Sequence, residues 1–123
     1  MIKVLIVEDV PEMAELLKTA VESVPNIRVS ALAASVLEAR VVVAKHRPDL
    51  VLLDEILLGE SVVDWLADLV QDGIPVILVT GVQDPTHPLP EGVLDRWVKP
   101  DWKQWPEWAQ KYGPKLKAAV GSK

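Results

Sequence analysis

The sequence predicts an α/β fold in which a doubly wound parallel sheet is covered by helices on both faces. Two observations lead to this prediction. Short, almost entirely aliphatic runs recur along the chain, as in strands that are buried on both faces. Most of the stretches between these runs space their apolar residues as an amphipathic helix does. Strands and helices that alternate with short joints favour right-handed βαβ crossovers.

Five short apolar runs are predicted as strands. They cover residues 2–7, 27–32, 50–53, 76–79 and 94–98, and the second run is the weakest. Helices are predicted over residues 11–24, 34–46 and 61–71, where the apolar positions form a stripe along one face. Pro11 suits the first turn of the first helix. Proline has no backbone N–H, and in the first turn this N–H would have no partner within the helix in any case.

The connection between the fourth and fifth strands departs from this alternation. Pro85, Pro88 and Pro90 crowd it, and a proline inside a helix costs about 3 kcal/mol. We therefore expect a fourth helix that is shortened or absent. After the fifth strand, Pro106 can begin a helix, and Gly113–Pro114 is expected to kink or divide it.

Aromatic residues at helical spacing mark the C-terminal part of the chain. They are Trp102, Trp105, Trp108 and Tyr112. One interpretation is that one or two of them pack against the sheet, where the fourth helix leaves a gap. The other is an exposed aromatic patch that docks a partner, since tryptophan and tyrosine are favoured at interface hot spots.

Composition narrows the possible functions. A chain of 123 residues that is 50% hydrophobic and 25% charged is expected to form one domain over residues 1–123. It has no cysteine, which excludes thiolate metal sites and disulfides. A formal net charge of −5 argues against direct nucleic-acid binding. No apolar run is long enough for a membrane helix, and the chain begins directly with strand-like sequence, so we expect no signal peptide and a cytoplasmic location.

Polar residues follow the predicted strands at their carboxyl ends, where open parallel sheets bind ligands. They are Glu8 and Asp9 after the first strand, Asp54 after the third, Thr80 after the fourth and Lys99 after the fifth. Each of them alone has an ordinary explanation as a helix cap, a turn residue or a solvated side chain. Their coincidence at one edge of the sheet favours a functional site.

The residue types at this edge suit phosphoryl transfer. Crowded carboxylates repel one another, and oxygen ligands without histidine or cysteine favour Mg²⁺. A central carboxylate such as Asp54 can attack a phosphoryl group and form an acyl phosphate. The transferred group then needs positive charge and a hydroxyl donor around it. Asp9 is the predicted metal ligand, Thr80 the predicted hydroxyl donor and Lys99 the predicted cation.

These residues resemble the receiver domain of two-component response regulators, the CheY-like family. The resemblance rests on Glu8–Asp9, the run from Pro48 to Asp54, Thr80 and Lys99–Pro100, and it covers essentially the whole chain. It implies a flavodoxin-like (βα)5 domain with the sheet order 2-1-3-4-5. It also implies signalling by Mg²⁺-dependent transfer of a phosphoryl group from a histidine kinase.

The resemblance assigns a role to each site residue. It implies that Asp54 is the phosphoacceptor and that Thr80 and Lys99 hold the phosphoryl oxygens. The implied Mg²⁺ ligands are Asp9, Asp54, the backbone carbonyl of Ile56 and Glu8. Glu8 would bind the ion either directly or through a water molecule. The Lys99–Pro100 peptide is implied to be cis.

The same resemblance implies a signalling protein that is not an enzyme, apart from catalysing its own phosphorylation and dephosphorylation. The implied partner is a sensor histidine kinase or a phosphotransfer protein. The signal would pass to a partner protein, or to an effector domain of a larger protein from which this domain was cut. The sequence indicates neither the downstream target nor an oligomeric state.

Departures from the family pattern leave an alternative open. Arg96 stands where the family usually has an aromatic residue that rotates inward on activation. Glu55 beside the acceptor is unusual, and strand alternation is expected to turn it away from Asp54. The alternative is an interaction module that keeps the receiver fold but acts independently of phosphorylation. Ile56 and Val82 flank the expected phosphoryl site and cannot orient a hydrolytic water, so slow dephosphorylation is predicted.

Overall fold

The computed structural model describes residues 1–55, 63–81 and 88–120. These residues form five strands and four helices. The strands are β1 (Ile2–Val7), β2 (Ile27–Ala33), β3 (Leu50–Asp54), β4 (Val76–Thr80) and β5 (Asp95–Val98). The helices are α1 (Pro11–Glu22), α2 (Val36–Lys45), α3 (Val63–Gln71) and α4 (Trp105–Ala119).

All five strands form one sheet in the order β2-β1-β3-β4-β5, which confirms the predicted fold class and strand order. Every neighbouring pair is parallel. The carboxyl ends of the strands therefore meet at one edge of the sheet. β1 and β3 are neighbours although β2 lies between them in the sequence, so the chain reverses direction across the sheet beside β1. Ligands bind at this kind of switch point in open α/β sheets.

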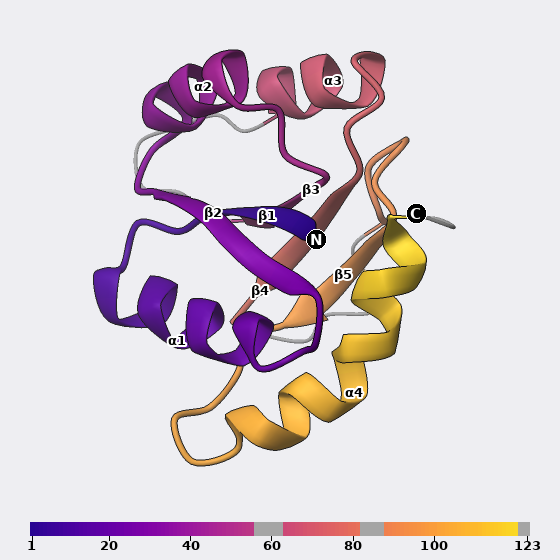
Figure 1. Cartoon of the computed structure of the whole chain (residues 1–123). Coiled ribbons are helices and arrows are strands. Elements are labelled where there is room, and N and C mark those ends of the chain that lie inside the picture. Colours follow the sequence, from indigo (N-terminus) through magenta and orange to yellow (C-terminus); the bar gives the residue numbers. More distant parts are fainter. Residues whose placement is uncertain (56–62, 82–87, 121–123) are drawn as a thin grey trace.

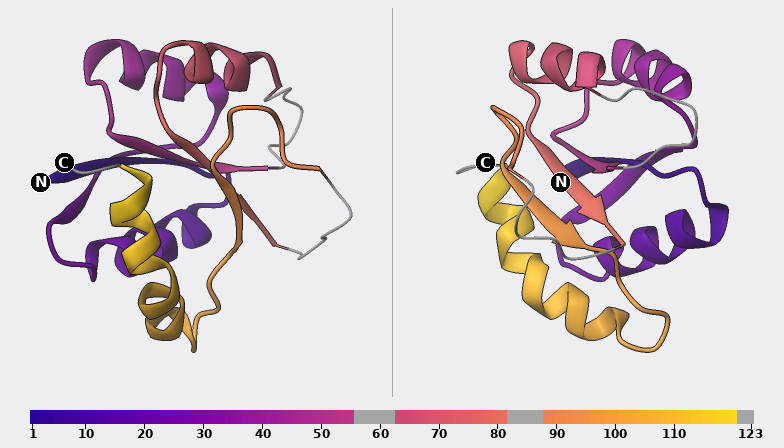
Figure 2. Two further views of the ribbon diagram at one scale, coloured as in Figure 1. Left: turned by 90° about the vertical axis from the view of Figure 1, so that its right-hand side faces the viewer. Right: turned by 180° about the vertical axis from the view of Figure 1, so that it is seen from behind.

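The helices form two layers around the sheet (Figure 1). α2 and α3 cover one face, while α1 and α4 cover the other, and the two further views agree (Figure 2). Side chains along the central strands alternate between two buried clusters. In β1, Val4 and Ile6 face α1 and α4, whereas Leu5 and Val7 join the cluster under α2 and α3. Burial on both faces explains why the three central strands, β1, β3 and β4, are nearly continuous apolar runs.

The start of α2 shows how local chemistry sets a helix boundary. The Ser35 hydroxyl accepts a hydrogen bond from the Glu38 backbone N–H at 3.1 Å. The Glu38 carboxylate in turn accepts one from the Ala34 N–H at 2.8 Å. This arrangement resembles a capping box, with the second bond to the residue before the N-cap, and it satisfies the Glu38 N–H that the helix itself leaves unpaired. The helix therefore begins at residue 36, two residues later than predicted.

The connection before β5 holds no helix in its described part, residues 88–94. This confirms the expected shortening or loss of the fourth helix there, while residues 82–87, with Pro85, lie outside the described residues. Gly92 turns the chain with a φ of 84°, and a Cβ at this position would lie 2.4 Å from Val70 Cγ1 of α3. Only glycine fits such a close approach in this backbone conformation. Val93 follows and is buried in the α2–α3 cluster.

α4 contains Pro114 yet is not divided, because it runs continuously from Trp105 to Ala119. Its ribbon bends along its length (Figure 1), as expected where a proline removes one hydrogen bond of the helix. Gly113 allows the helix to approach the turn after α1 closely, since a Cβ there would lie 3.3 Å from Val24 Cγ2. The described part of the chain contains no helix long and apolar enough to cross a membrane.

The aromatic residues divide between packing and exposure. The Tyr112 ring stacks on Trp97 of β5 with centroids 4.4 Å apart, and Trp108 meets Trp97 edge-on at 6.1 Å. The Trp108 indole N–H also donates to the Val98 carbonyl. The packing interpretation is therefore confirmed for Trp108 and Tyr112. Trp102, by contrast, is 61% exposed in the connection between β5 and α4.

Candidate functional site

Three carboxylates meet at the carboxyl end of the sheet. One oxygen from each of Glu8, Asp9 and Asp54 lies within 4.8 Å of the other two. The pairing of β1 with β3 places Val7 beside Leu53, so the residues that follow the two strands are neighbours. The Glu8 N–H donates to the Ala33 carbonyl of β2 at 2.9 Å, which holds the end of β1 in line with the sheet. The predicted convergence of these side chains is what the structure shows.

Lys99 joins this cluster from the far edge of the sheet. Its Nζ lies 2.6 Å from Glu8 Oε1 and 3.4 Å from Asp54 Oδ2. Its backbone N–H donates to the Thr80 carbonyl at 2.7 Å, which continues the β4–β5 ladder beyond Val98. The ammonium group thus points into the acidic cluster rather than into solvent.

The expectation of a cis peptide between Lys99 and Pro100 is wrong. The described residues contain no cis peptide bond. A trans amide is the more stable form of an X–Pro bond, and the Lys99 side chain reaches Glu8 and Asp54 with the peptide in this form.

Burial and charge shift the pKa values of Glu8 and Lys99. Burial raises the pKa of the Glu8 carboxyl to about 7, and the nearby Asp54 adds to this effect, while the Lys99 ammonium opposes it. Burial also lowers the pKa of Lys99, but its contacts with Glu8 and Asp54 outweigh burial and leave the pKa above its usual 10.5. Lys99 therefore stays charged at neutral pH beside the carboxyl groups of Glu8 and Asp54.

The other two predicted site residues differ in what the structure describes. Thr80 ends β4 and is buried. It lies at the same edge, since Asp54 pairs with Val79 and Thr80 with Val98. Ile56, whose carbonyl the family resemblance makes a metal ligand, lies outside the described residues, as does Val82.

The acidic cluster fits a magnesium ion. All its donors are carboxylate oxygens, and three of them lie close enough to share one cation. Hard oxygen donors without nitrogen or sulfur are the ligands that Mg²⁺ prefers. Glu8, Asp9 and Asp54 would hold the ion, and its charge would relieve their mutual repulsion.

A second ion pair lies beside the cluster and connects two residues that the sequence singled out separately. Arg96 of β5 binds the Glu55 carboxylate through two hydrogen bonds. Its Nε donates to Oε1 at 2.8 Å, and its Nη2 donates to Oε2 at 2.9 Å. The side chains are 16% and 27% exposed. Sequence reasoning missed this pair, although a signal was present: opposite charges stand near the ends of two strands that are separated by one strand.

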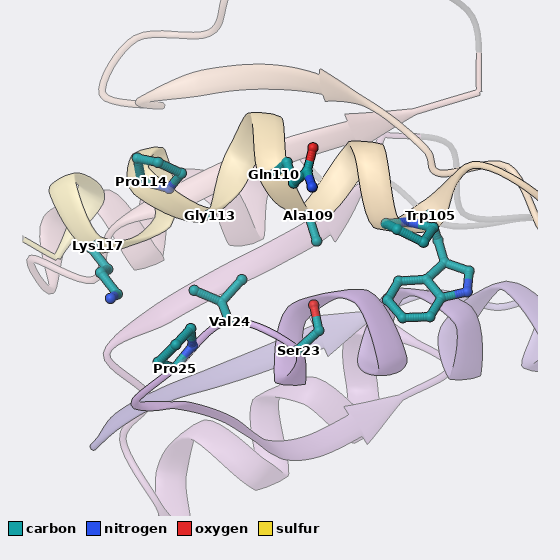
Figure 3. Close-up of a pocket in the computed structure, with 10 residues that line it drawn as sticks. Ser23, Val24, Pro25, Trp105, Ala109, Gln110, Gly113, Pro114 and Lys117 are labelled. Carbon is teal, nitrogen blue, oxygen red and sulfur yellow. The ribbon is translucent and has the colours of Figure 1, made fainter.

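An apolar groove elsewhere on the molecule does not belong to this site. It has a volume of about 590 Å³ and lies between the end of α1 and one side of α4. Figure 3 shows Val24 and Pro25 on one wall and Trp105, Ala109 and Gly113 on the other. It shares no residue with the acidic cluster.

Comparison with solved structures gives relatives of the same fold. The response regulator domain of Thermotoga maritima CheB matches with a TM-score of 0.84 and 22% identity over 100% of this chain and 98% of that chain. The receiver domain of Erythrobacter litoralis PhyR matches with a TM-score of 0.73 and 26% identity, over 99% and 92% of the two chains. A chain in the complex of the CheA3 P1 domain with CheY6 from R. sphaeroides matches with a TM-score of 0.77 and 22% identity, over 95% and 98%.

The sequence comparisons differ in outcome. Curated protein sequences give no match. The sequence pattern of the family described as the response regulator receiver domain, in contrast, matches residues 4–95, which is most of the chain and spans β1 to the start of β5. The chain therefore belongs to the response regulator receiver domain family of two-component signalling.

Proposed function

We propose that this receiver domain, taken as one unit over residues 1–123, accepts a phosphoryl group on Asp54 in a Mg²⁺-dependent reaction and passes the signal to a partner. The observation that carries the proposal is the meeting of Glu8, Asp9 and Asp54 with the Lys99 ammonium group at one end of the sheet. Asp54 is buried at the end of β3 and is the carboxylate that Lys99 contacts together with Glu8. The three carboxylates suit a metal ion, and the Lys99 ammonium group suits a negatively charged phosphoryl group bound next to that ion.

The proposed reaction is a transfer between two nucleophiles. An oxygen of the Asp54 carboxylate attacks the phosphorus of a phosphohistidine. The P–N bond breaks, its electron pair stays on the imidazole, and an O–P bond to Asp54 forms. The imidazole nitrogen takes up a proton from solvent. When bound, Mg²⁺ supplies positive charge beside the transferring group.

Lys99 and Thr80 have supporting roles in this proposal. The Lys99 ammonium already stands against Asp54 and Glu8, so it would meet the phosphoryl oxygens without costly rearrangement. Thr80, at the neighbouring strand end, would supply its hydroxyl. The Ile56 carbonyl completes the proposed metal ligands. These groups act only on the domain's own aspartate, which makes the protein a signalling module with no other substrate.

The proposed phosphodonor is a sensor histidine kinase or a phosphotransfer protein, and a cytoplasmic location belongs to the same proposal. One similar structure is a complex of the CheA3 P1 domain with CheY6, which supports a protein partner for this fold. The alternative, an interaction module independent of phosphorylation, gains support from Arg96 and from the absence of a helix in residues 88–94. The assembled acidic cluster disfavours it.

Intact mass spectrometry tests the proposal. The protein is incubated with Mg²⁺ and acetyl phosphate, and we expect a mass gain of one phosphoryl group. Asp54→Asn should show no gain, whereas Asp68→Asn, an exposed aspartate on α3, should be labelled like the unmodified protein. Chelation of the metal should prevent labelling. Equal labelling of the Asp54→Asn variant, or none of the unmodified protein, would contradict the proposal.

A further inference from the structure

The Arg96 side chain donates hydrogen bonds to two separate parts of the chain that the structure describes. Two bonds go to the Glu55 carboxylate, from Nε at 2.8 Å and from Nη2 at 2.9 Å. A third bond goes from the same Nη2 to the Pro88 carbonyl at 3.2 Å. The guanidinium group thus bridges the residue after Asp54 and the segment that leads into β5. A planar group with five N–H donors is suited to such a bridge.

The position of Arg96 in the sheet explains its reach. It pairs with Leu78 of β4, and β4 separates β5 from β3. Trp97 faces α1 and α4, so strand alternation places Arg96 on the opposite face. There its side chain extends past β4 to Glu55. The edge strand that carries Lys99 is therefore tied to the end of the strand that carries Asp54.

The other end of the bridge lies on residues 88–94, which we call the 88–94 segment. A few specific contacts hold it in place. The Leu94 N–H donates to the Val76 carbonyl at 2.9 Å, and the Val93 N–H donates to the Pro90 carbonyl at 3.1 Å. Leu89 and Leu94 are exposed. With few buried contacts, the segment is the kind of element that opens locally at small cost.

We propose that Arg96 is a positioning residue that couples the charge at Asp54 to the 88–94 segment, and this inference rests on the proposed phosphorylation of Asp54. A phosphoryl group adds negative charge on the residue that precedes Glu55 in the chain, and the guanidinium group is then attracted more strongly to this end of the sheet. Its bonds to the Glu55 carboxylate are charge-assisted on both sides, while the bond to the neutral Pro88 carbonyl is the longest of the three. The Pro88 bond is the one that yields, and the segment loosens.

The coupling satisfies the requirement that a ligand shifts an equilibrium only when it interacts differently with the two states. In one state Arg96 holds both Glu55 and Pro88. In the other, the extra charge draws it away from Pro88. The 88–94 segment, which takes the place of a helix in the described part of this connection, thereby becomes the part of the surface that reports phosphorylation.

Amide hydrogen exchange at Val93 and Leu94 tests the coupling, with the full chain in Mg²⁺ and with beryllofluoride as the phosphoryl mimic. In the unmodified protein we expect exchange at these two amides to rise about fivefold on adding beryllofluoride, the factor that corresponds to one neutral hydrogen bond. The Ile2 amide, which bonds to Asn26 O far from this region, should not change. In Arg96→Gln, exchange should be fast from the start and should not respond.

Two further variants distinguish coupling from general stability. Arg96→Lys keeps the positive charge but lacks the fork that binds both partners, and it should lose most of the response even if Arg96→Gln fails to fold. Arg40→Gln removes an exposed pair with Asp68 and should keep the full response.

Acetyl phosphate labelling of the same samples separates the two hypotheses. Unlabelled protein contradicts the proposed function and this inference with it. Labelled protein whose Val93 and Leu94 amides do not respond overturns the coupling alone, and so does an undiminished response in both Arg96 variants.

Discussion

Two ion-pair systems lie at the same end of the sheet, and they differ in their balance of charge. In the acidic cluster, one ammonium group faces the carboxylates of Glu8 and Asp54, with Asp9 close by. At Arg96, one guanidinium faces one carboxylate in a two-bond match. Among the described residues the cluster sets three carboxylates against the Lys99 ammonium group, and a metal cation would offset the repulsion between them. The guanidinium group and the Glu55 carboxylate match bond for bond, so this contact suits holding strands together rather than binding a ligand.

Labelling by acetyl phosphate should give the largest contrast between the two systems. Lys99→Gln removes the cation that would face the phosphoryl group, and we expect labelling about 100-fold slower. Arg96→Gln should label at nearly the unmodified rate, because the pair does not contact the acceptor in our proposal. Initial rates by mass spectrometry measure both. Equal losses in the two variants would remove the distinction, and thermal unfolding checks that Lys99→Gln remains folded.

The pH dependence of stability should expose the excess charge of the cluster. The pKa of Glu8 is raised to about 7 from 4.5, so the folded protein binds the proton more tightly than the unfolded chain does. The stability that this provides is complete below pH 4.5 and is lost as the pH rises through 7. Without metal, the unmodified protein should therefore lose on the order of 1–3 kcal/mol relative to Glu8→Gln between pH 4 and 8.

Urea unfolding at a series of pH values measures that difference. Added Mg²⁺ should reduce the loss at high pH, because the ionised carboxylate is then the better ligand. A constant difference between the two proteins across this range would show that Glu8 does not bind its proton more tightly in the folded state.

Metal affinity should respond to the cluster and not to other acidic groups. Asp9→Asn removes one carboxylate of the cluster, and we expect Mg²⁺ to bind at least about tenfold more weakly, judged by losses at metal sites of comparable kind. Asp68→Asn removes the same charge on α3 and should leave the affinity unchanged. Calorimetric titration gives both dissociation constants. Similar losses in the two variants would mean that only overall charge matters.

The smallest expected effect concerns the stability of the two arginine pairs. A double-mutant cycle of Arg96 with Glu55 should give a coupling of about 1–2 kcal/mol, since the bonds are charge-assisted and partly buried. The Arg40–Asp68 pair has one contact at 3.5 Å, with side chains 47% and 56% exposed, and should give close to 0–0.5 kcal/mol. Urea unfolding of the single and double variants provides both numbers. A coupling at Arg96 no larger than that at Arg40 would contradict a structural tie.

The sequence predicted those features that depend on local pattern. β1 begins and ends as predicted, and the other strands agree to within a residue at each end. The meeting of Glu8, Asp9, Asp54 and Lys99 also follows from pattern, because parallel strands bring their carboxyl ends to one edge. The roles of these residues remain predictions.

Features that depend on distant contacts could not be predicted in the same way. Glu55 and Arg96 were both noted as unusual, but their contact depends on the path of a side chain past β4. The start of α2, by contrast, is set by local bonds from the Glu38 N–H to Ser35 and from the Ala34 N–H to Glu38, so the Ser-x-x-Glu pattern could have placed it. The cis form of the Lys99–Pro100 peptide was carried over from the family resemblance, and no feature of the local sequence required it.

β5 is four residues long and places Arg96 beside Trp97 on opposite faces. Arg96 forms the ion pair with Glu55 on one face of the strand. On the other face, the indole ring of the next residue, Trp97, stacks on the phenol ring of Tyr112. Stacked aromatic rings in a fixed asymmetric setting give a near-ultraviolet circular dichroism signal. The protein thus carries its own chromophore one residue from Arg96, and a small slide of the edge strand becomes optically visible without an attached label.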